Sequence, residues 1–167
     1  MFKKITLPTG LRVITIPMKG VTTATVLVMV NTGSNNETKE INGISHFLEH
    51  MFLKGTKKRP SPQIIASEID EMGARTNAFT GNENTGYYIK VPKQKFNQAL
   101  ELLADIYKNS LLDEEEVNRE RGVILQEMRM IRDDPPRYIH DLYEDLLYGD
   151  QPAGWDIIGT PETLAAM

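Results

Sequence analysis

The sequence predicts a two-layer α+β domain in which helices cover one side of a mostly antiparallel sheet. Three observations lead to this prediction. The first third of the chain is strand-like, a second pair of strand-like segments follows near residue 80, and the rest has the three- and four-residue apolar spacing of amphipathic helices. Short turns between neighbouring strands favour antiparallel pairing. A length of 167 residues is enough for one domain with its own core.

Five segments are expected to be strands, because each is short, rich in β-branched or aromatic residues and bounded by turn residues. A Pro-Thr-Gly turn joins the first two into a hairpin, and a polar turn with a glycine joins the last two. The third is nearly all apolar from Val26 onward, which is typical of a central strand. The predicted strands span residues 3–7, 11–17, 22–30, 74–80 and 85–91.

The predicted helices are recognised by apolar periodicity and by their end signals. Ser61-Pro62 is an N-cap followed by proline at the first helical position, and three acids open the long helix that begins at residue 113. The expected helices span residues 43–54, 61–72, 94–109, 113–132 and 136–148. Thr160-Pro161 begins a further helix only seven residues before Met167. We therefore expect residues 1–167 to form a single domain that is cut near its C-terminal end.

The composition narrows the classes of function. The net charge is −4, so no basic surface indicates a nucleic acid or an anionic membrane as a partner. No apolar stretch approaches the roughly 20 residues that span a bilayer, and the N-terminus lacks the apolar core of a secretory signal. A cytoplasmic location is the resulting expectation. The cysteine count is zero, which leaves histidines and carboxylates as the strong metal ligands.

Two of the three histidines lie in the segment His46-Phe47-Leu48-Glu49-His50. On a helix, residues four apart share one face, so both imidazoles can converge on one ion. Glu49 lies beside them, where it could take the proton of a metal-bound water. This order is that of the inverted zinc-peptidase motif, the reverse of His-Glu-x-x-His. The competing interpretation is a pair of surface histidines on an amphipathic helix.

A catalytic zinc site needs three protein ligands and an open position. Without cysteine, the third ligand is expected to be a carboxylate or His140. Glu120 and Glu127 are candidates because they lie seven residues apart on one stripe of the predicted helix 113–132, together with the apolar Ile124. A carboxylate on such a face needs a partner when it is buried. That partner is either a metal centre or an arginine of the same helix.

These residues resemble the catalytic N-terminal domain of the M16, or pitrilysin-like, zinc metallopeptidases, an inverzincin family that includes insulin-degrading enzyme and mitochondrial processing peptidase. The family shows a glutamate ligand far downstream of His-x-x-Glu-His. Here 76 residues (51–126) separate His50 from Glu127, which is the family's spacing. Further matching segments are Gly43-Ile44-Ser45, Gly55-Thr56, Asn77-Ala78-Phe79-Thr80 and the Glu-Arg-Gly-Val-Ile-Leu-Gln-Glu-Met of residues 120–128.

The resemblance implies a LuxS/MPP-like metallohydrolase fold and a hydrolytic zinc centre. His46, His50 and Glu127 would bind one Zn²⁺ per chain, with water in the fourth position. Glu49 would accept the proton of that water as the catalytic base. Glu120 would support the site without binding the ion itself, by accepting the other N–H of a ligand histidine.

The resemblance also implies a mode of substrate binding. In this family an edge strand at Asn77, Ala78 and Phe79 pairs with the substrate backbone, and the aromatic ring shapes a side-chain pocket. Such pairing favours extended or unfolded peptides. From the residues alone, an ordinary hairpin strand is the competing interpretation.

The implied partners are a peptide substrate and either a second homologous domain or another copy of the chain. Family members build a closed chamber from at least two such domains, so we expect this segment alone to be a weak or inactive zinc endopeptidase. One alternative is a non-catalytic scaffold subunit of the same family. The presence of all three expected ligands and of the expected base disfavours it: His46, His50, Glu127 and Glu49. Another is an interaction domain with a fortuitous motif. A lyase of the autoinducer-2 synthase type is excluded, because it needs a cysteine ligand.

Overall fold

The computed structural model describes residues 1–167 and contains the predicted mixture of helices and antiparallel sheet. A three-stranded sheet has the order β3-β5-β4, and both neighbouring pairs are antiparallel. The first two strands form a separate hairpin. The strands are β1 Lys3–Thr6, β2 Arg12–Thr15, β3 Thr23–Val30, β4 Arg75–Thr80 and β5 Thr85–Pro92. All five therefore fall within the predicted segments or one residue beyond them.

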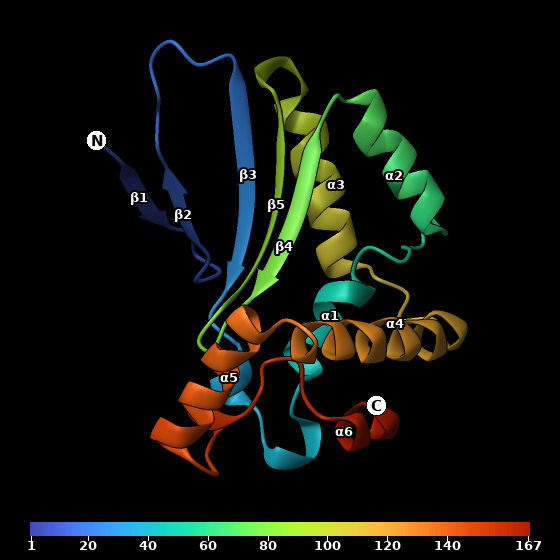
Figure 1. Cartoon of the computed structure of the whole chain (residues 1–167). Helices are drawn as coiled ribbons and strands as arrows, with labels where there is room; N and C mark the ends of the chain where they lie inside the picture. The colour runs from blue at the N-terminus through green and yellow to red at the C-terminus, as the bar shows by residue number, and fades with distance from the viewer.

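The helices form two groups, one against a face of the sheet and one beyond an end of it. Figure 1 shows α2 and α3 against one face of the sheet, and α1, α4, α5 and α6 gathered beyond the end at which β3 and β4 finish. The helices are α1 Ile44–Met51, α2 Pro62–Glu71, α3 Phe96–Lys108, α4 Glu114–Arg132, α5 Pro135–Tyr148 and α6 Pro161–Ala166. None of them is both long enough and apolar enough to cross a membrane.

Two apolar clusters hold these groups together. The sheet core joins α2 and α3 to the sheet through Val26, Ile65, Ile69, Met72, Tyr87, Ile89, Val91, Ala99, Leu102, Leu103 and Ile106. The helix core joins α1, α4, α6 and the segment before α6 through Phe47, Met51, Ile124, Met128, Ile158 and Leu164. Burial of Leu164 explains how a helix as short as α6 persists, since packing rather than propensity stabilises short helices. The helix core also fixes α1 against α4.

The prediction that residues 22–30 form a central strand was wrong. β5 lies in the centre, and β3 is an edge strand that pairs only with β5. Val26 faces the sheet core, whereas Leu27 and Met29 are 47% and 58% exposed on the opposite face. The apolar run looked like a strand covered on both faces, but nothing in this chain covers the outer one.

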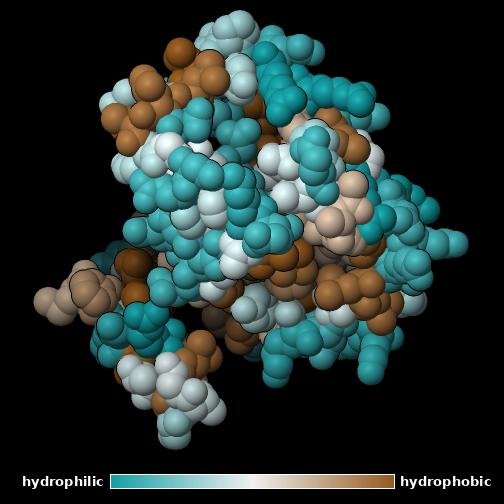
Figure 2. All heavy atoms as spheres, turned by 90° about the horizontal axis from the view of Figure 1, so that it is seen from below, coloured by the Kyte–Doolittle hydropathy of each residue, from teal (hydrophilic) through white to brown (hydrophobic).

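A second apolar surface lies on α5. Ile139, Leu142, Tyr143, Leu146 and Leu147 are all exposed, and their spacing places them on one side of the helix. Figure 2 shows apolar residues gathered in separate patches on the molecule seen from below, which is the end that carries the helical group. α5 therefore presents an apolar stripe to solvent.

The buried side chain of Arg59 connects the loop between α1 and α2 to α3 through hydrogen bonds. The guanidinium of Arg59 donates to Asp105 Oδ2 at 2.7 Å, to Glu101 Oε2 at 2.6 Å and to Glu68 Oε2 at 2.8 Å. Thr56 Oγ1 also donates to Asp105 Oδ2, at 2.7 Å, and accepts the Arg59 backbone N–H at 2.9 Å. This network anchors the segment that leaves the C-terminal end of α1.

Replacing Asp105 with asparagine is expected to lower the free energy of unfolding by about 2 kcal/mol at neutral pH. Breaking a buried ion pair commonly costs about 3–5 kcal/mol, but Arg59 keeps two other carboxylate partners. Burial raises the pKa of Asp105, yet hydrogen bonds from Asn109, Thr56 and Arg59 outweigh it and hold that pKa below its usual value. The carboxylate therefore stabilises the fold above the unfolded pKa of about 3.9, and this contribution disappears as the pH falls through the lower folded value.

Urea unfolding of the two proteins at pH 7 and near pH 3 measures this difference. It should shrink on acidification. Asp150→Asn is the matched control, because Asp150 pairs with Lys39 at the surface, and it should change stability much less. An Asp105→Asn loss no larger than that of the control would contradict the assigned role of the network.

Candidate metal centre

α1 brings the two motif histidines onto one face. Its eight residues, Ile44–Met51, follow Gly43, whose φ of +94° suits glycine at the turn into the helix. His46 and His50 lie one turn apart, with ring centroids separated by 4.8 Å and ring planes inclined by 61°. Phe47 and Met51 point the other way into the helix core. The apolar face of α1 thus fixes which way the imidazoles turn.

Glu127 reaches the same point from α4. Its Oε2 lies 3.8 Å from His46 Nε2 and 3.5 Å from His50 Nε2. One donor atom from each of the three side chains lies within 4.8 Å of the others. Tetrahedral ligands about 2.0–2.1 Å from zinc stand roughly 3.3 Å apart, so only small side-chain movements are needed. α1 and α4 are therefore adjacent, as the sequence predicts, and their donor set fits zinc.

Two of the three donors, His46 and Glu127, have charge states that suit a metal, whereas a hydrogen bond with Glu127 raises the pKa of His50. Burial lowers the pKa of His46 to about 4, and the neighbouring His50 acts in the same direction. A hydrogen bond with His50 lowers the pKa of Glu127 despite partial burial. Neutral imidazole and ionised carboxylate are the forms that coordinate metal. His46 and Glu127 are thus in their coordinating forms at neutral pH.

Glu120 lies beside His50, on the side of the ring away from Glu127. His50 Nδ1 and Glu120 Oε2 are 3.0 Å apart, and Glu120 is buried. The carboxylate can accept an N–H from Nδ1, which leaves His50 Nε2 free to face Glu127. Lys54 Nζ lies 2.5 Å from Glu120 Oε1 and supplies the charge partner that a buried carboxylate needs. His46 differs, because its Nδ1 is buried without a hydrogen-bond partner.

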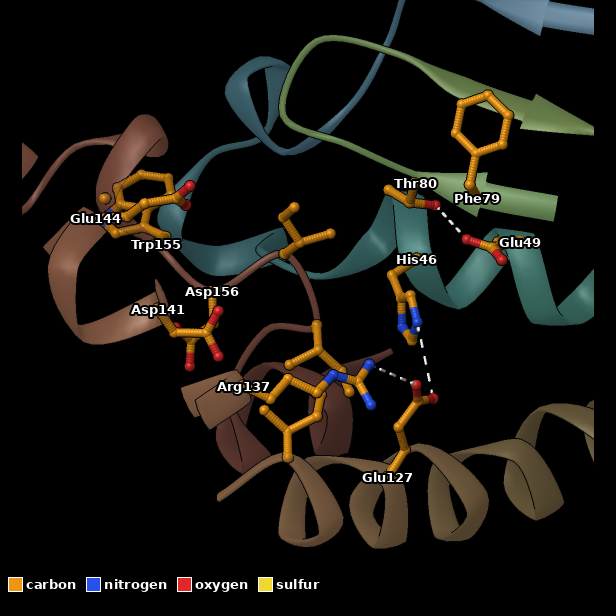
Figure 3. A pocket seen from close by; sticks show the side chains of 14 residues that line it. His46, Glu49, Phe79, Thr80, Glu127, Arg137, Asp141, Glu144, Trp155 and Asp156 are labelled. Atoms are coloured by element: carbon orange, nitrogen blue, oxygen red, sulfur yellow. Dashed lines mark hydrogen bonds and ion pairs between the residues drawn. The ribbon is translucent and has the colours of Figure 1, made fainter. Parts of the chain in front are cut away.

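The Glu49 side chain lines a cavity beside the donor set. Thr80 Oγ1, at the end of β4, donates a hydrogen bond of 2.6 Å to Glu49 Oε2. His46, Glu49 and Glu127 line this cavity of about 310 Å³ together with Phe79 and the segment 154–158. Figure 3 shows Glu49 directed toward Thr80 and His46 directed toward Glu127. The candidate base thus shares this cavity with two of the three donors, His46 and Glu127, whereas His50 does not line it.

The opposite part of the cavity is strongly charged. Asp141 and Glu144 of α5 and Asp156 line it beside Arg137. Burial raises the pKa values of Asp141 and Asp156. Arg137 lies 3.9 Å from Glu127 Oε1 (Figure 3). This guanidinium balances part of the negative charge next to the donor set.

The predicted substrate strand is an edge strand, with β5 on one side and no partner on the other. Phe79 lines the cavity, whereas Asn77 and Ala78 do not. Phe79 pairs across the sheet with Gly86, and its ring covers that glycine: a Cβ added there would lie 2.3 Å from Phe79 Cζ. Gly86 therefore leaves the space in which the ring lies.

Comparison with known proteins identifies the family. The sequence profile of the insulinase family, Peptidase family M16, matches residues 12–161. This chain belongs to family M16. It is 43% identical over 166 residues to YmxG, an uncharacterized zinc protease of Bacillus subtilis, which covers 99% of this chain and 40% of that protein. The human mitochondrial-processing peptidase subunit beta is 41% identical over 161 residues, covering 96% of this chain and 32% of that protein.

The solved structures support the same assignment. A protease from Helicobacter pylori superimposes with a TM-score of 0.92 at 28% identity, covering all of this chain and 40% of that one. The M16 chain described here therefore spans less than half the length of the relatives it matches.

Four further side chains, which carry no motif of their own, contact the site from other segments of this M16 domain. Lys54, Thr80 and Arg137 contact Glu120, Glu49 and Glu127, and Glu37 accepts backbone N–H groups at the start of α1. None carries a spacing signal toward the motif. Thr80 was noted only as part of a matching segment, and only the fold brings it to Glu49. His140, an open alternative for the third ligand, is not part of the donor group.

Proposed function

We propose that this chain is the metal-bearing domain of a zinc-dependent endopeptidase that hydrolyses extended peptides. The observation that carries the proposal is the convergence of His46, His50 and Glu127, two of which, His46 and Glu127, line one cavity with Glu49. Zinc, when bound there, polarises a peptide carbonyl and makes hydroxide available near neutral pH. The relatives named as zinc proteases support the same metal.

Glu49 has the chemistry and the surroundings of the general base in this proposal. Its carboxylate takes a proton from the attacking water and passes it to the leaving amine as the peptide C–N bond breaks. The Thr80 hydrogen bond holds one carboxylate oxygen, so the other remains available to the reacting groups. Glu120 fixes the tautomer of His50, so Nε2 faces the donor set.

The free edge of β4 provides a way to hold the peptide. A substrate strand that pairs with the backbone of residues 77–79 would run into the cavity that Phe79 and Glu49 share. Backbone pairing selects an extended conformation rather than a particular sequence. This supports flexible or unfolded peptides as the substrate class.

A second domain, or a second copy of the chain, is part of the proposal. The matched relatives are more than twice as long as the matched segment. The uncovered outer face of β3 and the apolar stripe of α5 are surfaces that further protein could cover. A closed chamber would exclude water and hold the substrate for cleavage.

Cleavage of an internally quenched fluorescent peptide tests the function. The chain as printed and any longer form of the same protein are assayed after zinc loading, after chelation, and after zinc is restored. Activity that chelation removes and zinc restores supports the proposal. Stoichiometric zinc without cleavage in any form would favour the non-catalytic scaffold subunit. Absence of stoichiometric zinc would favour a plain interaction domain.

A further inference from the structure

The helix that carries the metal motif begins without a capping side chain of its own. Its N-cap residue is Gly43, so the first backbone N–H groups of α1 need acceptors from elsewhere. Glu37, from the preceding loop, accepts two of the backbone N–H groups at this point. Its Oε2 accepts the Gly43 N–H at 2.7 Å, and its Oε1 accepts the Ser45 N–H at 2.8 Å. A carboxylate six residues upstream thus replaces the usual cap.

This carboxylate is buried and committed to that role. Glu37 is only 6% exposed and has no cationic partner among the ion pairs of the chain. Its further contact is Asn42 Nδ2, at 3.2 Å. A buried carboxylate without a cation depends on hydrogen-bond donors and on the positive end of the helix dipole. The start of α1 and the Glu37 carboxylate therefore stabilise each other.

The same contacts connect α1 to the far wall of the cavity. Asn42 Nδ2 also donates to the Asp156 carbonyl, at 3.1 Å. Gly43 packs closely against Ile158: a Cβ added at Gly43 would lie 2.7 Å from the Ile158 carbonyl oxygen. Asp156 and Ile158 both line the cavity. Glu37 thus lies where the first turn of α1 meets this wall.

Of the three candidate metal donors, His46 depends most on the conformation of the first turn of α1. It directly follows Ser45, whose N–H is bound by Glu37, whereas His50 lies a turn further on and is held by Glu120. His46 has no corresponding support, because its Nδ1 is unpartnered. Its position therefore depends on how the helix begins.

We propose that Glu37 is a positioning residue of the metal centre. By binding the Gly43 and Ser45 N–H groups, it fixes the first turn of α1 and thereby the placement of His46 against Glu127 and the 156–158 wall. This inference rests on the proposed zinc function, because Glu37 would affect the site by changing its affinity for zinc.

Glu37→Gln is the principal test. The variant keeps the size of the side chain, but one oxygen becomes an NH₂ group that cannot accept a hydrogen bond, so one of the two helix N–H groups loses its acceptor. We expect zinc affinity, measured by competition with a chromophoric chelator below the unfolding temperature, to fall about tenfold, the size seen when a supporting contact behind a ligand is lost. Glu40→Gln is the matched control, because Glu40 is exposed nearby and should leave the affinity unchanged.

Two further measurements separate positioning from folding. Amide hydrogen exchange of residues 43–50 should show faster exchange in the first turn of α1 in folded Glu37→Gln, while exchange in the sheet core is unchanged. Glu37→Asp retains both oxygens at shorter reach and should bind zinc with intermediate affinity. If Glu37→Gln does not fold, the comparison of Glu37→Asp with Glu40→Asp decides.

The outcomes distinguish this inference from the proposed function. Wild-type chain that binds one zinc, together with Glu37 variants of unchanged affinity, would overturn the positioning role and leave the zinc function standing. Wild-type chain that binds no stoichiometric zinc would overturn the proposed function, and the positioning role with it. An affinity order of wild type, Glu37→Asp and Glu37→Gln, with both Glu40 controls at the wild-type level, supports the inference.

Discussion

Replacing Glu49 with glutamine is expected to leave zinc bound and to slow peptide cleavage by about 10²–10⁴-fold, the usual contribution of a positioned acid–base group. The amide can still accept the Thr80 hydrogen bond, so the local structure should persist. It cannot take the proton of the attacking water. The loss should therefore appear in kcat with little change in KM.

The measurement combines turnover of a quenched peptide with metal analysis of the same sample. Glu71→Gln is a suitable control, because Glu71 is exposed at the end of α2 and should retain the wild-type rate. Undiminished cleavage by zinc-loaded Glu49→Gln would remove Glu49 from the mechanism.

Replacing His50 with alanine should abolish both zinc binding and cleavage. His50 faces Glu127 through Nε2 and Glu120 through Nδ1, so its loss removes one donor and disconnects the supporting carboxylate. Two remaining donors are too few for a catalytic zinc site. We expect zinc affinity to fall by more than about 100-fold, beyond the effect of losing a supporting contact alone.

Zinc content after dialysis, together with far-UV circular dichroism, tests this expectation. His140→Ala is the matched control, since His140 is exposed on α5 and lies outside the donor group. It should retain one zinc per chain. Full zinc occupancy in His50→Ala would show that the metal is held by other groups.

The parts that were predictable from sequence carry a local period or a distinctive spacing. His46 and His50 follow the helical repeat, and the apolar stripe around Ile124 placed Glu120 and Glu127 on the buried side of α4. The distance from His50 to Glu127 then connected two helices that are remote in sequence. Hairpins followed from their turn residues, because a turn constrains its two flanking strands directly.

The parts that were missed depend on contacts between unrelated segments. Glu37 lies in a polar loop and looks like a solvated acid until the fold places it under the first turn of α1. Lys54 could pair with many carboxylates of the chain, and only packing selects Glu120. The position of β3 failed for another reason: apolar residues show that a face can be covered, but not whether this chain supplies the cover.

The separation of the donor residues along the chain has a mechanical consequence. His50 and Glu127 bracket residues 51–126, a segment that contains α2, β4, β5 and α3 and therefore two of the three strands of the main sheet. An ion held by His46, His50 and Glu127 would act as a cross-link that closes this long loop, and long loops lose the most chain entropy on closure. Metal binding would then strengthen the contact between α1 and α4 that the helix core already makes. A bound ion would thus stabilise the tertiary structure in addition to its role in catalysis.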